Sequence, residues 1–213
     1  MNEMSLLSSL ETLRRYHRSG ATRSYDFRMA QLKKLKEAIY KYELAIHDAL
    51  YKDLRKSAEE SWVTETGMVL SEISVAQQQL KQWMRPRKVA TNLLNLPGSS
   101  KLMPEPLGVV LIVGPFNYPF QLLINPLVGA IAAGNCVVLK AGELAVHTAA
   151  VMKEMIESIF PPEYVLMVEG TGVEVLPPMM SHFTFDHVFF TGSIGTGRAI
   201  YKMAAERLVP VTL

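Results

Sequence analysis

Three segments that could do chemistry each follow directly after a run of apolar residues predicted to be a β-strand. They are residues 114–119, 140–143 and 191–197. In open α/β folds the carboxyl ends of parallel strands lie at one edge of the sheet, and ligands bind there. Each segment alone is weak evidence, but three at strand ends predict one common site.

The first segment contains Asn117, preceded by Gly114, Pro115 and Phe116. A helix is predicted to begin at Phe120, so the Asn117 amide would lie near a helix N-terminus. A donor at that place is suited to stabilising a developing oxyanion. The alternative is that Asn117 only satisfies backbone groups in a tight turn.

The second segment places Lys140 at the end of a predicted strand and Glu143 three residues later. A cation and a two-oxygen acceptor at this spacing can reach the hydroxyl groups of an adenosine ribose. A surface ion pair is the alternative for these two residues.

The third segment is a glycine-rich turn between a predicted strand and a predicted helix. Such turns let backbone N–H groups and a helix N-terminus approach a pyrophosphate closely. The turn lacks the Lys-Ser/Thr of a Walker loop, and no G-x-G-x-x-G follows the first strand. Its residues are Thr191, Gly192, Ser193, Ile194, Gly195, Thr196 and Gly197.

The elements that position these segments begin in a stretch without charged residues or His, from Pro106 to Leu139. A membrane-spanning helix needs about 20 unbroken apolar residues, and glycines and prolines interrupt this stretch repeatedly. The stretch instead predicts a buried βαβ unit with a strand at 108–113, a helix at 120–133 and a strand at 136–139.

The alternation of helix and strand continues to the last residue, which predicts a parallel, Rossmann-like α/β sheet with right-handed connections. Five strands are enough for a dinucleotide-binding domain. The further predicted helices span 146–159, 172–180 and 195–207, and the further strands span 164–168, 187–191 and 209–213.

The segment before this sheet is predicted to be helical, because apolar residues recur every three or four positions through about residue 85. A hairpin is expected at 90–107 around a turn at 97–100. It is either an oligomer contact or an ordinary surface hairpin. We therefore predict helices in 1–88, a hairpin in 89–107 and a dinucleotide-binding domain in 108–213.

Composition narrows the classes of function. The net charge of +2 is too small to indicate a nucleic-acid partner. One Cys and no apolar signal segment at the N-terminus favour a reducing compartment, so we expect a cytoplasmic protein without a membrane segment. His147, His182 and His187 have no metal-ligand spacing, so we expect no metal.

Taken together, these motifs resemble the aldehyde dehydrogenase superfamily, and the Pro-Phe-Asn-Tyr-Pro turn and helical N-terminus are most similar to its class 3 branch of fatty and aromatic aldehyde dehydrogenases. The resemblance covers nearly the whole chain. The matching segments are EPLGVV at 105–110, GPFNYP at 114–119, GNCVVLK at 134–140, FTGS at 190–193 and VPVTL at 209–213.

The resemblance implies that an aldehyde is the substrate, that NAD is the preferred cofactor with NADP possible, and that the protein is a homodimer. It assigns Asn117 to the oxyanion of a thiohemiacetal, Lys140 and Glu143 to the adenosine ribose, the 192–197 turn to the pyrophosphate, and Gly172 to the neighbourhood of the adenine. Residues 141 and 142 are Ala-Gly where the family usually has Pro-Ser.

The resemblance also implies that the general-base Glu, the nucleophilic Cys and the catalytic domain lie beyond residue 213. Cys136 would begin a strand at the opposite edge of the sheet from Asn117, roughly 15 Å away, so a structural role is expected for it. We therefore expect the isolated chain to be inactive. A truncated, non-catalytic dinucleotide-binding or interaction module is the alternative.

Overall fold

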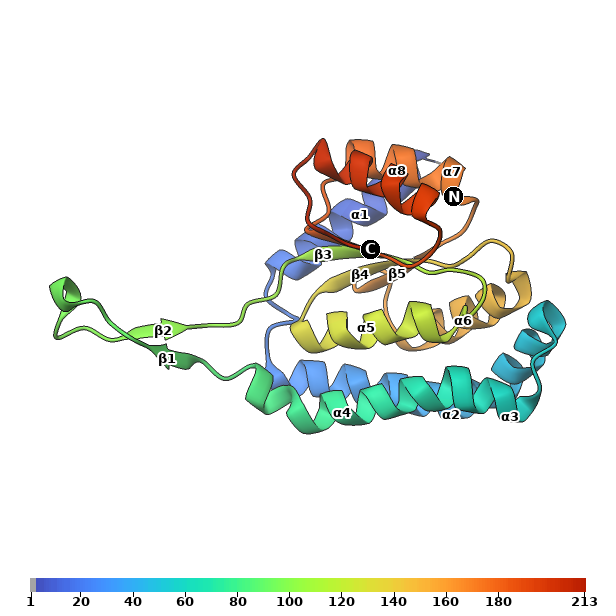
Figure 1. The fold of residues 1–213 in the computed structure, drawn as a ribbon, viewed down its shortest axis with the longest axis horizontal. Helices are drawn as coiled ribbons and strands as arrows, with labels where there is room; N and C mark the ends of the chain where they lie inside the picture. Colours follow the sequence, from blue (N-terminus) through green and yellow to red (C-terminus); the bar gives the residue numbers. More distant parts are fainter. Residues whose placement is uncertain (1–2) are drawn as a thin grey trace.

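A five-stranded parallel sheet forms the centre of the molecule in the computed structural model, which describes residues 3–213 (Figure 1). The strands lie in the order β5-β4-β3-β6-β7. The predicted parallel α/β fold is therefore confirmed. The strands are β3 (Val109–Val113), β4 (Cys136–Lys140), β5 (Val165–Val168), β6 (His187–Phe190) and β7 (Val211–Thr212).

The charge-free stretch supplies the central strand β3 and all of the neighbouring β4 except its last residue, Lys140, and every residue of both strands is buried. They pair in parallel, with Val109 opposite Cys136 and Val113 opposite Lys140. A strand can be apolar throughout only when helices cover both faces of its sheet. This register brings the segments after Val113 and Lys140 out at the same edge.

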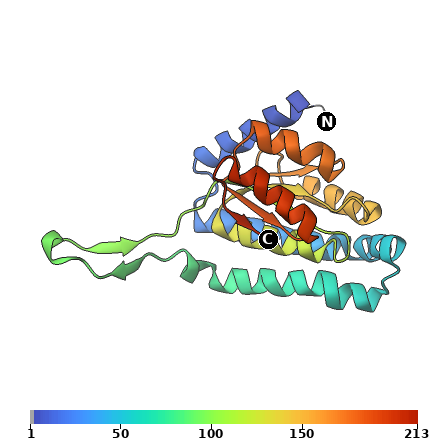
Figure 2. The same cartoon turned by 45° about the horizontal axis from the view of Figure 1, so that its top comes forward.

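Helices cover the sheet on both sides (Figures 1 and 2). On one face lie α5 (Gln121–Ala133) and α6 (Val146–Ile159). On the other lie α1 (Glu3–Arg18), α7 (Gly172–His182) and α8 (Ile194–Ala205). Helices thus shield both faces of the sheet from solvent, and the ends of the strands remain accessible to a ligand.

A second helical layer packs outside α5 and α6 and comes from the N-terminal part of the chain. In it, α2 packs against α6 and α5, and α4 packs against α5. The layer therefore lies against the sides of α5 and α6 that face away from the sheet. Its elements are α2 (Tyr25–Leu54), α3 (Ala58–Ser61), the π-helical turn η1 (Trp62–Thr66) and α4 (Gly67–Trp83).

The hairpin projects away from the rest of the molecule (Figure 1), but its first strand lies earlier than predicted. β1 (Arg87–Val89) pairs antiparallel with β2 (Ser100–Leu102), and a 3-10 turn, η2 (Leu93–Asn95), lies between them. The expected start at Ala90 was wrong because β1 is exposed and begins with two basic residues, so no apolar pattern marks it.

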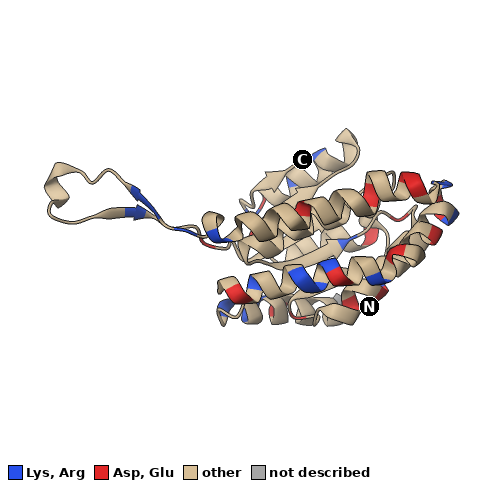
Figure 3. Ribbon diagram, turned by 90° about the horizontal axis from the view of Figure 1, so that it is seen from below, with Lys and Arg blue, Asp and Glu red and all other residues tan. Residues whose placement is uncertain are grey.

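Other boundaries differ by a few residues. The final strand is limited to Val211–Thr212, and α7 continues to His182, beyond the predicted end at Met180. Lys and Arg are interspersed with Asp and Glu along the N-terminal helices in the face that Figure 3 displays. Across residues 3–213, no helix combines the length and apolar character that crossing a membrane requires.

Candidate functional site

The carboxyl ends of three strands meet at one edge of the sheet, as the sequence predicted. The N–H of Gly114, after β3, donates to the Lys140 carbonyl at 3.0 Å, and the N–H of Thr191, after β6, donates to the Val113 carbonyl at 3.0 Å. From β3 the chain moves outward to β4 and β5, then returns to β6 on the other side of β3. This change of direction is the place where open α/β sheets bind ligands.

A cleft of about 620 Å³ lies at this edge, within the range of about 300–1,000 Å³ typical of ligand pockets. It collects residues from all three segments and from the start of α7. Of the predicted site residues it is lined by Gly114, Pro115, Phe116, Lys140, Glu143, Gly172, Thr191, Gly192, Ser193, Gly195 and Thr196.

Three of the predicted residues lie outside this cleft. Ile194 and Gly197 line an adjoining hollow of about 720 Å³, which shares the residues at the end of β6 with the cleft. Asn117 lies in the exposed turn after β3. The strand ends therefore carry two adjoining hollows with the Asn117 turn nearby.

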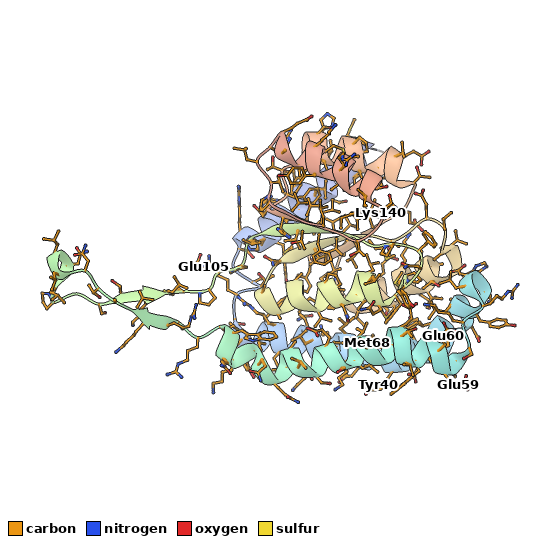
Figure 4. The ribbon with its side chains drawn as sticks, in the orientation of Figure 1. Tyr40, Glu59, Glu60, Met68, Glu105 and Lys140 are labelled. Atoms are coloured by element: carbon orange, nitrogen blue, oxygen red, sulfur yellow. The ribbon has the colours of Figure 1, made fainter. Side chains whose placement is uncertain are left out.

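Lys140 is the last residue of β4 and is labelled in Figure 4. Its side chain is buried. Its Nζ donates to the Ala141 carbonyl at 2.5 Å. Burial lowers the pKa of Lys140, and the nearby Glu143 carboxylate acts in the opposite direction. An ammonium has three donors, so Lys140 can hold the turn and still donate into the cleft.

Glu143 links the turn after β4 to the start of α7. Its Oε2 accepts from the Gly172 N–H at 2.8 Å, a favourable position for a carboxylate because the N-terminal end of a helix is positive. Glu143 is exposed. This hydrogen bond, rather than the surface ion pair considered above, fixes a negative charge at the mouth of the cleft.

Gly142 allows the first two segments to touch backbone to backbone. A Cβ atom at this position would lie 2.6 Å from the Pro115 carbonyl oxygen and 2.9 Å from the Phe116 nitrogen. Such distances are too short for any side chain without movement of the backbone. Gly142, at a position where Ser is usual, therefore permits a close backbone contact between the turn after β3 and the turn after β4.

The glycine-rich turn presents the N-terminus of α8 to the cleft. Ser193 caps this helix, because its Oγ accepts from the Thr196 N–H at 3.2 Å. Among residues 3–213, apart from the adjacent residues and the nearby backbone of α8 itself, no atom lies within 4 Å of the place that a Cβ atom at Gly195 would take. The turn is thus open at Gly195 to a group that accepts hydrogen bonds.

Sequence reasoning missed the apolar walls of the cleft, which come from facing sides of α7 and α8. These side chains recur at helical spacing, the same signal that core residues give, so nothing in the sequence distinguished them. They are Val173, Leu176 and Pro177 from α7 and Ala199, Ile200 and Met203 from α8.

The Asn117 side chain is held in one orientation. Its Oδ1 accepts from the Tyr118 N–H at 3.1 Å, so it does satisfy a backbone group, as the alternative reading held. Its Nδ2 donates to no group among residues 3–213. Its backbone carbonyl accepts from Lys56 Nζ at 3.0 Å. Asn117 therefore carries an amide donor that is still available.

Cys136 lies at the start of β4, opposite Val109 and thus at the other end of the sheet from the cleft. It is fully buried, and burial raises the pKa of its thiol to about 12. A nucleophilic Cys needs an accessible thiolate. Within residues 3–213, His, Cys, Asp and Glu form no group of three or more that could hold a metal ion.

Residues 12–213 match the aldehyde dehydrogenase family. The chain is 46% identical over 192 residues to 4,4'-diaponeurosporen-aldehyde dehydrogenase from Staphylococcus aureus, covering 90% of this chain and 41% of that protein. It is 43% identical over 201 residues to aldehyde dehydrogenase family 3 member H1 from Arabidopsis thaliana, covering 94% and 41%. The chain therefore spans less than half the length of these relatives.

Solved structures of aldehyde dehydrogenases have the same fold. The substrate-bound Staphylococcus aureus AldH superposes with a TM-score of 0.94 at 43% identity, covering 100% of this chain and 46% of that one. Betaine aldehyde dehydrogenase from Staphylococcus aureus, in complex with NAD+, superposes with a TM-score of 0.83 at 26% identity, covering 95% and 40%. From its fold, its site and these matches, this chain belongs to the aldehyde dehydrogenase family, with class 3 members among its relatives.

Proposed function

We propose that the chain is the cofactor-binding portion of an NAD(P)+-dependent aldehyde dehydrogenase, which oxidises an aldehyde to a carboxylic acid. The observation that carries this proposal is that Lys140, Glu143 and the glycine-rich turn converge on one cleft at the strand ends. Family membership supplies the reaction class.

The residues of the cleft fit a dinucleotide. The apolar walls from α7 and α8 suit a flat adenine, with Gly172 beside it, and Lys140 and Glu143 at the end of β4 suit the ribose hydroxyls. The open backbone around Gly195 at the start of α8 suits the pyrophosphate. When bound, NAD(P)+ supplies a hydride acceptor.

The charges around the ribose position favour NAD over NADP. The Glu143 carboxylate is fixed at the cleft mouth and would repel a 2'-phosphate. Lys140 would attract one, but its Nζ is already bonded to the Ala141 carbonyl. We propose that NAD is preferred and that NADP can bind.

Asn117 is proposed to donate its free amide hydrogen to the oxyanion that forms when a nucleophile attacks the aldehyde carbonyl. Fixed donors of this kind act because they are already oriented before charge develops. The buried Cys136 cannot serve as that nucleophile. We propose that the thiol and the general base come from parts of the protein outside these 213 residues, and that the 213 residues alone do not oxidise aldehydes.

We further propose a cytoplasmic homodimer in which the projecting hairpin is a contact between subunits. The single, reduced Cys fits a reducing compartment. The hairpin turn exposes Leu93 and Leu94, which are 86% and 92% accessible. Apolar side chains this exposed on a projecting element favour contact with a partner surface.

The testing experiment compares the 213-residue chain with the full-length protein that contains it. Calorimetric titration of the chain with NAD+ should give one binding site. Only the full-length protein should form NADH from NAD+ and an aldehyde, and Asn117→Ala should reduce that rate by about 100-fold. Binding of NAD+ without NADH formation by the full-length protein would instead support the non-catalytic module.

A further inference from the structure

A buried ion pair lies beside the Asn117 turn and comes from the N-terminal helical layer. Lys56 Nζ and Glu65 Oε1 are 2.5 Å apart, and the side chains are 8% and 0% exposed. Removing two charges from water costs several kcal/mol each, and apolar residues of similar size are often as stable in such places. A contribution to folding stability therefore does not by itself explain why this buried ion pair is present.

Glu65 caps the helix that follows Asn117. Its Oε2 accepts from the N–H of Phe120 at 3.1 Å and from the N–H of Gln121 at 2.8 Å. Phe120 is the N-cap residue of α5 and cannot cap through its own side chain. The first N–H groups of a helix otherwise lack partners, so Glu65 fixes where α5 begins.

Lys56 holds the residues on the other side of the same turn. Its Nζ donates to the Asn117 carbonyl at 3.0 Å and lies 3.9 Å from the centre of the Tyr118 ring. An ammonium over an aromatic face is attracted by the ring. Together, the pair contacts four of the five positions from 117 to 121. It makes three hydrogen bonds with backbone groups, at 117, 120 and 121, and one contact with the side-chain ring at 118.

The π-helical turn that contains Glu65 also helps to place its carboxylate beside the start of α5. Glu65 lies in the π-helical turn η1, and α4 begins directly after at Gly67. A Cβ atom at Gly67 would lie 2.6 Å from the Trp62 carbonyl oxygen, so the wide turn depends on glycine there. Single π turns change which side chains face inward and are frequent at functional sites.

We propose that Lys56 and Glu65 are positioning residues that hold the Asn117 amide in the orientation needed for oxyanion stabilisation. The inference rests on the proposed function, because it assumes that Asn117 contacts the reacting aldehyde. The pair itself touches neither substrate nor cofactor. Through this pair, the N-terminal helical layer fixes the position of the turn after β3.

Lys56 and Glu65 are both buried, so each charge depends on the other for its partner. Desolvation raises the pKa of Glu65, whereas Lys56 and the N–H groups of Phe120 and Gln121 act to lower it. Removing Lys56 alone would leave a buried carboxylate without its cation, which risks unfolding. A double substitution that removes both charges therefore tests positioning more cleanly.

The experiment uses the full-length enzyme with Lys56→Met/Glu65→Gln. This variant leaves no unpaired charge. The Gln oxygen can still accept from Phe120 and Gln121, so the cap of α5 is kept, and the variant removes the ion pair and the contacts of Lys56 with the Asn117 carbonyl and the Tyr118 ring. We expect kcat to fall by about 10- to 100-fold, because small misplacements of a catalytic group have effects of that size, while the Kd for NAD+ changes less than about twofold. Adding Asn117→Ala should cause no further loss in kcat beyond that of Asn117→Ala alone.

The matched control removes another partly buried ion pair, Arg14–Asp186, with Arg14→Met/Asp186→Asn. Asp186 accepts from the Val109 N–H at 2.7 Å, at the start of β3 and so at the opposite end of the strand from Asn117. The control should lower thermal stability without lowering kcat. An unchanged kcat in Lys56→Met/Glu65→Gln, or losses that multiply with Asn117→Ala, would overturn the proposal.

Failure of the proposed function can be distinguished from failure of this inference. If the full-length wild type does not oxidise aldehydes, the assignment of the reaction is wrong, and the role in catalysis given to the pair is wrong with it. If the wild type is active, amide hydrogen exchange gives a second readout. The 114–121 segment should exchange faster in Lys56→Met/Glu65→Gln than in wild type, and equal exchange would contradict positioning.

Discussion

The charged side chains buried in this protein hold backbone groups rather than other side chains alone. Arg28 donates to the carbonyls of Thr22 and Ala132, and Lys140 donates to the carbonyl of Ala141. A buried charge is tolerated when hydrogen bonds satisfy it. At the residue scale, these charges therefore hold the α1–α2 loop against the end of α5 and fix the turn after β4.

Glu143→Gln should change cofactor preference. Gln keeps an acceptor for the Gly172 N–H but removes the negative charge at the cleft mouth. We expect the Kd for NADP+ to fall by about tenfold, equivalent to about 1.4 kcal/mol, with little change for NAD+. Titration of both cofactors checks this, and Glu206→Gln beyond the far end of α8 is the control. Equal NADP+ affinities in wild type and Glu143→Gln would contradict the role of Glu143.

Cys136 should be unreactive in the folded protein. Burial raises the pKa of this thiol to about 12, so little thiolate is present near neutral pH, and no reagent can reach it. We expect alkylation by iodoacetamide to be at least about 100-fold slower in native protein than in urea. As Cys136 is the one Cys of the sequence, mass spectrometry reads the result directly. Native and unfolded rates that match would show an exposed thiol.

Two of the helices on the sheet are capped by distant residues. The N-cap positions of α5 and α6 are Phe120 and Ala145, and neither provides a side-chain cap. Glu65 serves α5. Asp53, near the end of α2, serves α6, accepting from the backbone N–H groups of His147 at 3.2 Å and Thr148 at 2.8 Å. The outer helical layer thus fixes the starts of the inner one.

Asp53→Asn should lower the free energy of unfolding by about 1 kcal/mol near neutral pH, because Asn has one acceptor oxygen where Asp53 uses two, one for the N–H of His147 and one for the N–H of Thr148. Burial by itself would raise the pKa of Asp53, but hydrogen bonds from Thr148 and His147 outweigh it and keep the pKa below its ordinary value. For a carboxyl group with a lowered pKa, the stabilisation is present above the unfolded pKa of about 4 and is lost as pH falls through the folded pKa.

Urea unfolding at several pH values measures this effect. The difference between wild type and Asp53→Asn should be largest near neutral pH and should shrink below about pH 4. Asp48→Asn, on the exposed side of α2, is the control and should have little effect. A difference that stays constant across this range would mean that the charge of Asp53 does not stabilise α6.

At the scale of the whole molecule, the body and the hairpin differ in what holds them. The sheet and its helical layers share one apolar core, whereas the hairpin extends from the body and exposes its apolar side chains (Figure 1). An isolated two-stranded hairpin is marginally stable in water. This marginal stability supports the proposed contact of the hairpin with a second subunit.

Leu93→Ser/Leu94→Ser should convert the proposed dimer to a monomer. Both side chains are exposed on the projecting turn, so replacing them should change the stability of the body by less than about 0.5 kcal/mol. Light scattering after size-exclusion chromatography measures the mass. Leu44→Ser, at an exposed position on α2, is the control and should leave the mass unchanged. A double variant that stays dimeric would place the contact elsewhere.

The sequence by itself determined the strands, the helices between them and the edge at which the three polar segments meet. These follow from local patterns, because buried parallel strands are continuously apolar and glycine turns mark their ends. The first strand of the hairpin escaped this reasoning because its exposed basic residues carry no such pattern.

Tertiary structure alone decided how the segments are held. Lys56 and Glu65 lie 61 and 55 residues from the backbone groups they bind in the turn after β3, and Asp53 lies 95 residues from Thr148. In the sequence Lys56 lies among other basic and acidic residues of a helical segment, which is the pattern of a solvated helix face. A charge at such a position is either exposed or buried depending on which helix packs beside it, and that packing is set by the whole core rather than by neighbouring residues.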